Sequence, residues 1–285
     1  MIRPPVLCYH RIGGPLELGV TRVARSVFVR QMTTLANAGW HTLTLDEFAR
    51  SASPYLFPVT RLSAANRTFL LTFDDGYASF AEQVYPVLAD LGFTATTFLV
   101  TDFIGRENRW DVRYTRHRLS HLDWPAIETW RARGFDFGSH SATHRRLPWL
   151  KRPALIEDLT RSRETLVQRL GAPAGRAIAY PFGAVNLSTV ELARKTGFEL
   201  GFAGVLDKGT DPLQLPRVPV YVWDAGRMPA GLRGGLVGSV ARVTAHMANR
   251  CAVGTSLMLA LTRPFRRRGH AEAAPQGETQ QDRPH

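Results

Sequence analysis

The chain has few cysteines. Among its 285 residues there are two, Cys8 and Cys251, and they lie far apart in the sequence. Two distant cysteines do not make the disulfide framework of a small secreted domain, and they are too few for a zinc site built from cysteines. We therefore expect the protein to work in a reducing compartment.

Long hydrophobic runs are also lacking. Residues 1–5 lead directly into Val6–Tyr9 without the apolar core of a signal peptide. The most apolar later stretch, Ala252–Leu261, is well short of the roughly 20 residues that cross a bilayer as a helix. These absences predict a cytoplasmic protein, with peripheral contact at the inner membrane face as an extension of that expectation.

Acidic residues are absent between residues 225 and 271, where eight arginines carry +8 of the net charge of +12. Residues 225–263 are interpreted as a basic, weakly amphipathic helical appendage and residues 264–285 as a disordered tail. Such a helix can lie on an anionic membrane surface, although packing against the domain is commoner. Because most of the excess charge lies in these two segments and outside the core domain, no nucleic-acid partner is expected. The arginines are Arg227, Arg233, Arg242, Arg250, Arg263, Arg266, Arg267 and Arg268.

Residues 1–224 alternate short apolar strands with amphipathic helices, which is typical of a single α/β domain. Asp46 is expected to cap a brief helix, and Ser51–Asn66 to form a surface loop. Repeated strand–helix units predict a parallel sheet, most economically closed into a barrel of about seven strands. Strands are expected at Val6–Ile12, Trp40–Leu45, Phe69–Phe73, Thr94–Val100, Phe135–Gly138, Ala177–Tyr180, Glu199–Ala203 and Val218–Val222. Helices are expected at Val27–Ala38, Ala78–Leu91, Trp124–Arg133, Pro153–Leu170 and Leu187–Thr196.

Two adjacent carboxylates end the most apolar strand, in the segment Phe69–Tyr77. Carboxylates at the C-terminal end of a buried strand sit where α/β folds place their chemistry. Because successive residues leaving a strand point in different directions, Asp74 and Asp75 can hold different partners, one a cation and the other a proton. The alternative is an ordinary Asp-Asp-Gly turn that caps the following helix.

Two histidines four residues apart, His140 and His144, follow another expected strand. This spacing is one helical turn, so both imidazoles can point at the same metal. Their position after a strand places them at the same end of the sheet as Asp74 and Asp75. Two histidines and one carboxylate leave coordination positions open, as in a catalytic metal site, and the second carboxylate remains free to act as a base.

Three segments together resemble the successive motifs of the polysaccharide deacetylase family, the NodB homology domain of carbohydrate esterase family 4. They are Thr72–Gly76, His140–His144 and Tyr180–Gly183, and the likeness covers roughly residues 5–222. The resemblance implies a distorted (β/α) barrel. It also implies a divalent metal and the removal of N- or O-acetyl groups from sugars. A site of two histidines and one aspartate accepts zinc, which we expect first, or cobalt, nickel or iron.

The resemblance also implies roles for individual residues. Asp74 resembles the catalytic base of the family, and Asp75, His140 and His144 resemble its metal ligands. The backbone N–H of Phe182 resembles the donor that holds the oxyanion, although on its own the segment around it would be interpreted as a turn with a core aromatic.

The chain departs from the pattern of the best-known members at two points. Ala179 stands where they carry an arginine that pairs with the catalytic aspartate, and Leu215–Val220 lacks their histidine acid. Both departures match a subgroup with the motif Ala-Tyr-Pro-Tyr/Phe-Gly, in which a histidine on the first strand is the acid. His10 is that candidate, with a structural histidine beside Tyr9 as the alternative. From its charge, Arg217 is a candidate for the lost partner of the aspartate.

Residues at candidate substrate-binding positions complete the expected site. An aromatic face stacks on a sugar ring, so Trp110 in the long loop Thr101–Leu122 can line a groove, or else only anchor the loop. We place Trp110, Asp111, Tyr180, Pro181 and Arg217 in this group. The other histidines show no comparable placement and are expected to be surface or core residues.

The sequence therefore predicts a metal-dependent hydrolase that removes acetyl groups, N-acetyl first, from a glycan or glycan precursor. Its expected partner is an acetylated saccharide, with peripheral membrane contact through the basic segment as an addition. The first alternative is a catalytically silent carbohydrate-binding domain of the same fold. A nucleic-acid-associated protein built on the basic tail is a further alternative, and it would bind in a salt-sensitive way.

Overall fold

A computed structural model describes residues 4–14, 21–52, 67–108, 119–204 and 211–224, with Gly226, Pro229 and Leu232. Several predicted features lie outside these residues: Trp110, Asp111, almost all of the loop predicted at Ser51–Asn66, and nearly the whole appendage and tail. In the helices that the structure describes, none combines the length and the apolar character that a membrane span requires.

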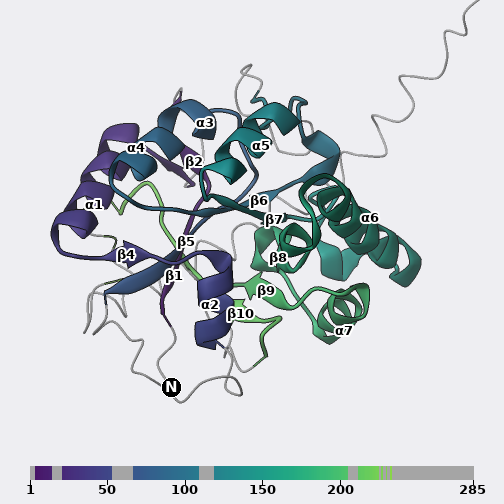
Figure 1. Cartoon of the computed structure of the whole chain (residues 1–285). Helices are drawn as coiled ribbons and strands as arrows, with labels where there is room; N and C mark the ends of the chain where they lie inside the picture. The colour runs from purple at the N-terminus through teal and green to yellow at the C-terminus, as the bar shows by residue number, and fades with distance from the viewer. Residues whose placement is uncertain are drawn as a thin grey trace, which may run out of the picture.

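A parallel sheet of nine strands lies at the centre of the described residues (Figure 1). Its main path runs β10-β9-β8-β7-β6-β5-β1-β11, and β4 pairs with β5 beside it. A separate parallel pair joins β2 (Arg11–Ile12) to β3 (Arg22–Val23). The sheet strands are β1 (Val6–Tyr9), β4 (His41–Thr42), β5 (Thr68–Phe73), β6 (Thr96–Leu99), β7 (Asp136–Ser139), β8 (Ala177–Ala179), β9 (Leu200–Ala203), β10 (Leu215–Pro216) and β11 (Val218–Pro219).

The sheet nearly closes on itself at Arg217. Strands β10 and β11 lie at opposite ends of the strand order, yet only this one residue separates them in the chain. The chain therefore passes directly from one edge of the sheet to the other, which confirms the predicted barrel of parallel strands. Among the nine described strands of this sheet, only β10 has no counterpart in the predicted strand ranges, because a strand of two residues leaves no recognisable pattern in the sequence.

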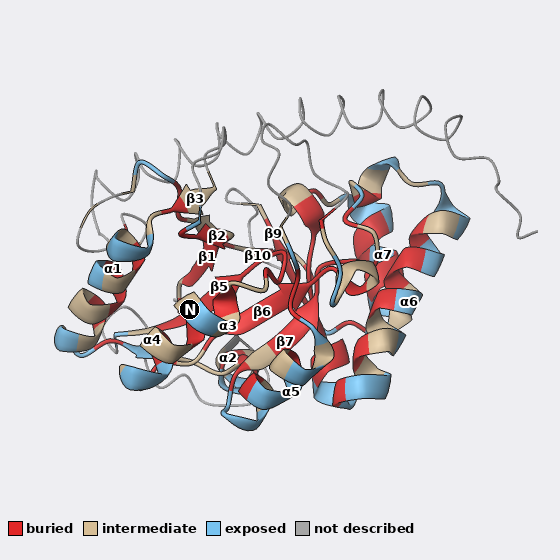
Figure 2. Cartoon of the chain, turned by 90° about the horizontal axis from the view of Figure 1, so that it is seen from above, coloured by how far each residue is buried: buried red, intermediate tan, exposed pale blue. Residues whose placement is uncertain are grey.

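Helices cover the outside of the barrel and turn their exposed faces away from it (Figure 2). In the part of the chain that the structure describes, four short 3-10 turns lie among them: η2 (Thr101–Phe103), η3 (Leu147–Trp149), η4 (Ala172–Gly175) and η5 (Pro181–Gly183). Four of the predicted helices are confirmed with small changes at their ends. The α-helices are α1 (Arg25–Asn37), α2 (Leu45–Ala52), α3 (Phe80–Gln83), α4 (Tyr85–Asp90), α5 (Trp124–Ala132), α6 (Arg152–Leu170) and α7 (Leu187–Thr196).

Two local predictions were wrong. The single helix expected at Ala78–Leu91 is divided at Val84, because Pro86 has no N–H for a continuing helix and is tolerated only at the start of the new one, α4. Helix α2 is capped by Thr44 rather than Asp46. The Thr44 Oγ1 accepts from the N–H of Glu47 at 3.2 Å, and the Glu47 carboxylate accepts from the N–H of Thr44 at 2.8 Å, which forms a capping box.

The alternation of side chains along β5 separates two cores. Phe69 and Leu71 belong to the larger cluster beneath α1, α3 and α4, whereas Leu70 belongs to a smaller cluster with Phe98 and Phe202. The smaller cluster draws side chains from β1, β5, β6, β8, β9 and β10, so it fills the barrel interior. With a period of two, residue 74 follows Leu70 on the interior face. The barrel core therefore forms the floor beneath the first of the two carboxylates.

Helix α2 closes the N-terminal end of the barrel. Its Phe48 is buried with its ring centroid 5.9 Å from that of Phe202, and the N–H of Leu45 donates to Asp136 at the start of β7, at 2.7 Å. With this end covered, the C-terminal ends of the strands are the side from which the interior can be reached.

We predict that Phe202→Ala lowers the free energy of unfolding by about 3–5 kcal/mol, because it removes a fully buried ring from the centre of the interior cluster. The matched control is Leu187→Ala, at a side chain that is 85% exposed, and it should change stability by less than about 0.5 kcal/mol. Denaturant unfolding of both variants checks this prediction. Equal effects of the two substitutions would contradict the assignment of the barrel core.

Candidate active site

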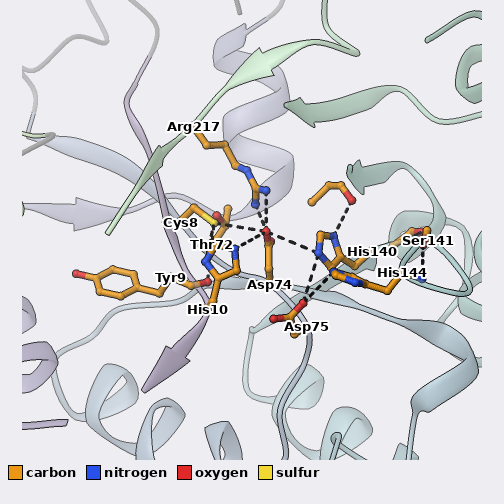
Figure 3. Close-up of polar contacts among 12 residues, drawn as sticks. Cys8, Tyr9, His10, Thr72, Asp74, Asp75, His140, Ser141, His144 and Arg217 are labelled. Atoms are coloured by element: carbon orange, nitrogen blue, oxygen red, sulfur yellow. Dashed lines mark hydrogen bonds and ion pairs between the residues drawn. The ribbon is translucent and has the colours of Figure 1, made fainter. Parts of the chain in front are cut away.

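The chemically active side chains gather at the C-terminal ends of neighbouring strands (Figure 3). His10 follows β1 and Asp74 follows β5, and the register pairs Tyr9 with Phe73 one residue earlier. His140 follows β7 in the same way. The sequence prediction that these residues meet at one end of the sheet is therefore confirmed by the geometry.

Asp74 forms a buried, two-pronged ion pair with Arg217. The Nη1 and Nη2 groups of the guanidinium donate to Oδ1 and Oδ2, each at 2.7 Å, and Asp74 and Arg217 are only 1% and 5% exposed. Burial alone would raise the pKa of Asp74, but Arg217 and then His140 outweigh it and hold that pKa well below its usual range. Asp74 is therefore ionised at neutral pH. The helix-capping alternative fails, because α3 begins only at Phe80 and its N-cap is Ser79.

Arg217 itself is held from two sides. Burial would lower its pKa, but Asp74 raises it, so the guanidinium stays charged. Its Cζ lies 5.7 Å from the ring centroid of Phe98, which belongs to the barrel core. Arg217 was predicted both as the partner of the aspartate and as a substrate-binding residue, and its guanidinium faces Asp74, which confirms the first prediction. It can act on the reaction by orienting that carboxylate.

Asp75 lies against the two histidines instead. Its Oδ1 is 3.5 Å from Nε2 of His140 and 3.4 Å from Nε2 of His144. Burial lowers the pKa of His140, and it lowers that of His144 further, so both rings are neutral at pH 7. A carboxylate and two neutral imidazoles thus present three ligand atoms within 4.8 Å of one another.

This donor set fits a divalent metal. The Nδ1–H of His140 donates to the backbone carbonyl of Ala179 at 2.7 Å, so the lone pair of the neutral ring is on Nε2, which faces Asp75. Metal-binding histidines usually have this arrangement, in which a hydrogen bond from the other ring nitrogen fixes the orientation of the ring. Two imidazoles and one carboxylate suit zinc and its neighbours better than the hard cations calcium or magnesium.

The histidine segment is not helical, which corrects one part of the prediction. Both Ser141 and His144 have positive φ angles, 65° and 55°, so the spacing of four residues does not represent a helical turn. The N–H of His144 donates to Oγ of Ser141 at 2.9 Å, and this tight loop brings the two rings to a centroid separation of 5.0 Å. A compact loop therefore achieves the convergence that a helix was expected to provide.

Helix α6 fixes this loop through Asp158, a residue that the sequence analysis did not identify. The buried carboxylate accepts from the N–H of Ala142 at 2.8 Å and from both the N–H and the hydroxyl of Thr143. Ser162, one turn further along α6, bonds the hydroxyl of Ser139 at 2.9 Å. The only signal in the sequence was an acidic residue at a core-facing position of the predicted helix, after a segment rich in Ser and Thr.

His121 is the second unidentified residue. It was expected to be a surface or core residue and it is buried, 4% exposed, with its Nδ1–H donating to the backbone carbonyl of Asp75 at 2.7 Å. Asp75 needs support because its φ of 70° is an uncommon conformation for a residue with a side chain. The N–H of Leu122 also donates to the carbonyl of Gly76 at 2.9 Å. Residues 121–122 therefore hold the Asp-Asp turn in its strained shape.

His10 lies on the side of Asp74 away from the histidine pair. Its Nε2 is 3.7 Å from Asp74 Oδ2, and its side chain is 24% exposed. Burial lowers the pKa of His10 to about 4, although Asp74 opposes the shift. The ring is therefore neutral at pH 7. The thiol of Cys8 is also present here, where it donates to Asp74 Oδ2 at 3.5 Å.

Phe182 stands in a strained turn beside His144. Its φ is 62° and its ring centroid is 4.9 Å from that of His144. The turn is closed by the N–H groups of Gly183 and Ala184, which donate to Tyr180 and Pro181, and neither bond uses the N–H of Phe182. The Tyr180 side chain is fully buried in a hydrophobic cluster, and Pro181 is buried too. Side-chain contact of these two residues with a substrate, as the sequence predicted, is not supported.

Comparison with known proteins agrees with these motifs. The sequence model of the family described as polysaccharide deacetylase matches residues 62–201. YxkH of Bacillus subtilis (strain 168), which is named for this family, is 28% identical over 69% of this chain and 63% of its own length. The poly-beta-1,6-N-acetyl-D-glucosamine N-deacetylase of Staphylococcus aureus (strain MSSA476) is 25% identical over 64% of this chain and 60% of its own length. The chain thus spans less than two thirds of the length of both relatives.

The fold agrees with that of a solved deacetylase. The deacetylase PplD of Streptococcus pyogenes, solved in complex with acetate, superimposes with a TM-score of 0.64 at 21% sequence identity, over 77% of this chain and 93% of that chain. The three motifs gather at one end of this barrel, and the family model matches the part of the chain that carries most of it: residues 62–201 belong to the polysaccharide deacetylase family.

Proposed function

We propose that the protein is a metal-dependent deacetylase that hydrolyses the N-acetyl groups of a glycan or glycan precursor. The observation that carries the proposal is the division between the two adjacent carboxylates. Asp75 faces two neutral imidazoles, whereas Asp74 is held by Arg217 with a histidine beside it. The name of the Staphylococcus aureus relative supports a polymer of N-acetylglucosamine as the first substrate to test.

Asp75, His140 and His144 would hold the metal, for which zinc is the first candidate. A divalent cation bound there would polarise the acetyl carbonyl and make a water molecule more acidic. Asp74 is then the group that takes the proton from the attacking water. Because it is ionised and its two oxygens are fixed by Arg217, it is ready to accept a proton in one orientation.

A neutral His10 is too weak an acid to protonate the leaving nitrogen, so it first has to gain a proton. Its Nε2 lies 3.7 Å from the Asp74 oxygen, close enough for the proton taken from water to pass on to it. Protonated His10 would then donate to the nitrogen of the breaking C–N bond, which leaves as an amine. The proton balance closes, because the proton that leaves water reaches the product and both side chains return to their starting states.

The backbone N–H of Phe182 is the candidate donor to the oxyanion that develops on the acetyl oxygen. The strained turn at Phe182 lies on the proposed metal side of the site, because its ring is 4.9 Å from that of His144. Removing one such donor typically costs about 3 kcal/mol of transition-state stabilisation. His121 and Asp158 would contribute indirectly, because they fix the two loops that carry the proposed ligands.

Metal removal and the Asp74→Asn variant test the proposal most simply. We expect acetate release from oligomers of N-acetylglucosamine to stop when a chelator strips the metal, and to return with zinc or cobalt. Asp74→Asn should lower kcat by roughly 10²–10⁴-fold, the usual contribution of a general base, while one metal ion per chain still binds. A chain that binds sugar but neither binds metal nor releases acetate would instead be a silent carbohydrate-binding domain.

Substrates with different leaving groups test His10. An amine leaves poorly without a proton, whereas an activated phenol leaves readily, so His10→Ala should slow amide hydrolysis about 100-fold or more and aryl acetate hydrolysis far less. Asp74→Asn is the matched comparison and should slow both substrates. If His10→Ala slows both to the same degree, His10 is not the acid and its role is structural.

Substitutions of Arg217 distinguish positioning from substrate binding. Arg217→Lys keeps the charge but loses the two-pronged contact, so kcat should fall while KM stays nearly constant. Arg217→Met leaves the Asp74 carboxylate buried and unpaired and should lower the free energy of unfolding by about 3–5 kcal/mol. Steady-state kinetics and denaturant unfolding provide these values. A rise in KM at unchanged kcat would instead indicate that Arg217 binds the substrate.

A further inference from the structure

A second cluster of metal-binding side chains adjoins the proposed catalytic metal site. Cys8, His10 and Asp74 each offer one ligand atom, and these atoms also lie within 4.8 Å of one another. The thiol sulfur is 3.5 Å from Asp74 Oδ2 and 3.9 Å from Nδ1 of His10, and Nε2 of His10 is 3.7 Å from the same carboxylate oxygen. Figure 3 shows the three side chains converging on the side of Asp74 away from Asp75.

One ion takes only one nitrogen of His10, so the separation that matters is the 4.8 Å within which one ligand atom from each residue lies. Small side-chain movements would bring these atoms to the separations found around a bound ion. Ligands of a tetrahedral zinc, with Zn–S near 2.3 Å and Zn–N near 2.0 Å, lie about 3.5 Å apart. A thiolate is a soft ligand that prefers zinc, cadmium and similar cations, and its combination with imidazole and carboxylate leaves one position open. The cluster therefore differs in chemistry from the Asp75 site, which has no sulfur.

We propose that Cys8, His10 and Asp74 form a second cation site that takes a thiophilic divalent metal, such as cadmium or zinc in excess, and that its occupation inhibits the enzyme. The inhibition rests on the proposed function, because the cation would bind the base and the acid of that mechanism together. The binding itself does not depend on any activity.

The second site should be the weaker of the two. Arg217 holds a positive charge against the same carboxylate, and burial favours the neutral thiol of Cys8, whose proton must leave to solvent when metal binds. The carboxylate can still serve both partners, because Oδ1 remains bonded to Nη1 of Arg217 while Oδ2 turns to the cation. The partly exposed ring of His10 provides the entry from solvent. We therefore expect the first equivalent of metal to bind at the Asp75 site and the second here.

A cobalt titration followed by absorption spectroscopy tests the proposal on the full chain. Cobalt bound to histidine and carboxylate gives only weak visible bands, whereas thiolate-bound cobalt adds an intense charge-transfer band in the near ultraviolet. We expect that band to grow with the second equivalent. It should disappear in Cys8→Ser and persist in Cys251→Ser, the matched control at the other cysteine of the chain.

Cadmium NMR of the unmodified chain keeps the test independent of how the variants fold. Two resonances are expected, one shifted by a sulfur ligand and one with nitrogen and oxygen ligands alone. A single resonance without a sulfur shift, or a charge-transfer band that survives in Cys8→Ser, would overturn the proposal.

Inhibition is measured separately, as the activity at excess zinc relative to each variant's own maximum. Wild type and Cys251→Ser should lose activity above one equivalent, and Cys8→Ser should lose much less. Equal loss in all three would overturn the inhibitory role even if the sulfur-bound metal is present. If no acetate is released under any condition, the proposed function fails, while the spectra still decide whether the second site exists.

Discussion

The buried pair of Asp74 and Arg217 is the interaction on which the site depends. It joins the end of β5 to the single residue between β10 and β11, where the two edges of the sheet meet. Either charge alone would be expensive to bury, so the barrel closes at this point only if both are present. Phe98 beneath the guanidinium ties the pair to the barrel core. One contact thus both closes the barrel and orients the Asp74 carboxylate.

The same contact separates two carboxylates that are adjacent in the chain. Asp74 continues the interior face of β5 and meets a fixed positive charge, while Asp75 turns away through a left-handed conformation and meets two neutral imidazoles. Arg217 therefore neutralises one acid and leaves the other available for a cation. His121 and Asp158 support the side of the site formed by Asp75 and the two histidines. His121 holds the strained turn in place, and Asp158 holds the histidine loop.

The sequence allowed the fold class and the gathering of the motifs to be predicted, because strand periodicity and residues that follow strand ends are local patterns. It did not reveal the shape of the His140–His144 loop, where side chains of α6 override the helical spacing. It gave no signal for His121, whose role comes from a contact with Asp75 across 46 residues. Arg217 could be suggested from charge alone, but its pairing depends on β10, a strand of two residues. The burial of Tyr180 likewise follows from tertiary packing that its motif does not encode.

The central claim is that the two carboxylates have different partners. A crystal structure of the protein with one equivalent of zinc, located by its anomalous scattering, tests this claim most directly. The account predicts one zinc ion bound by Asp75, His140 and His144, with Asp74 still paired to Arg217. A zinc ion bound by Asp74 in place of Arg217, or one that leaves Asp75 unbound, would contradict it.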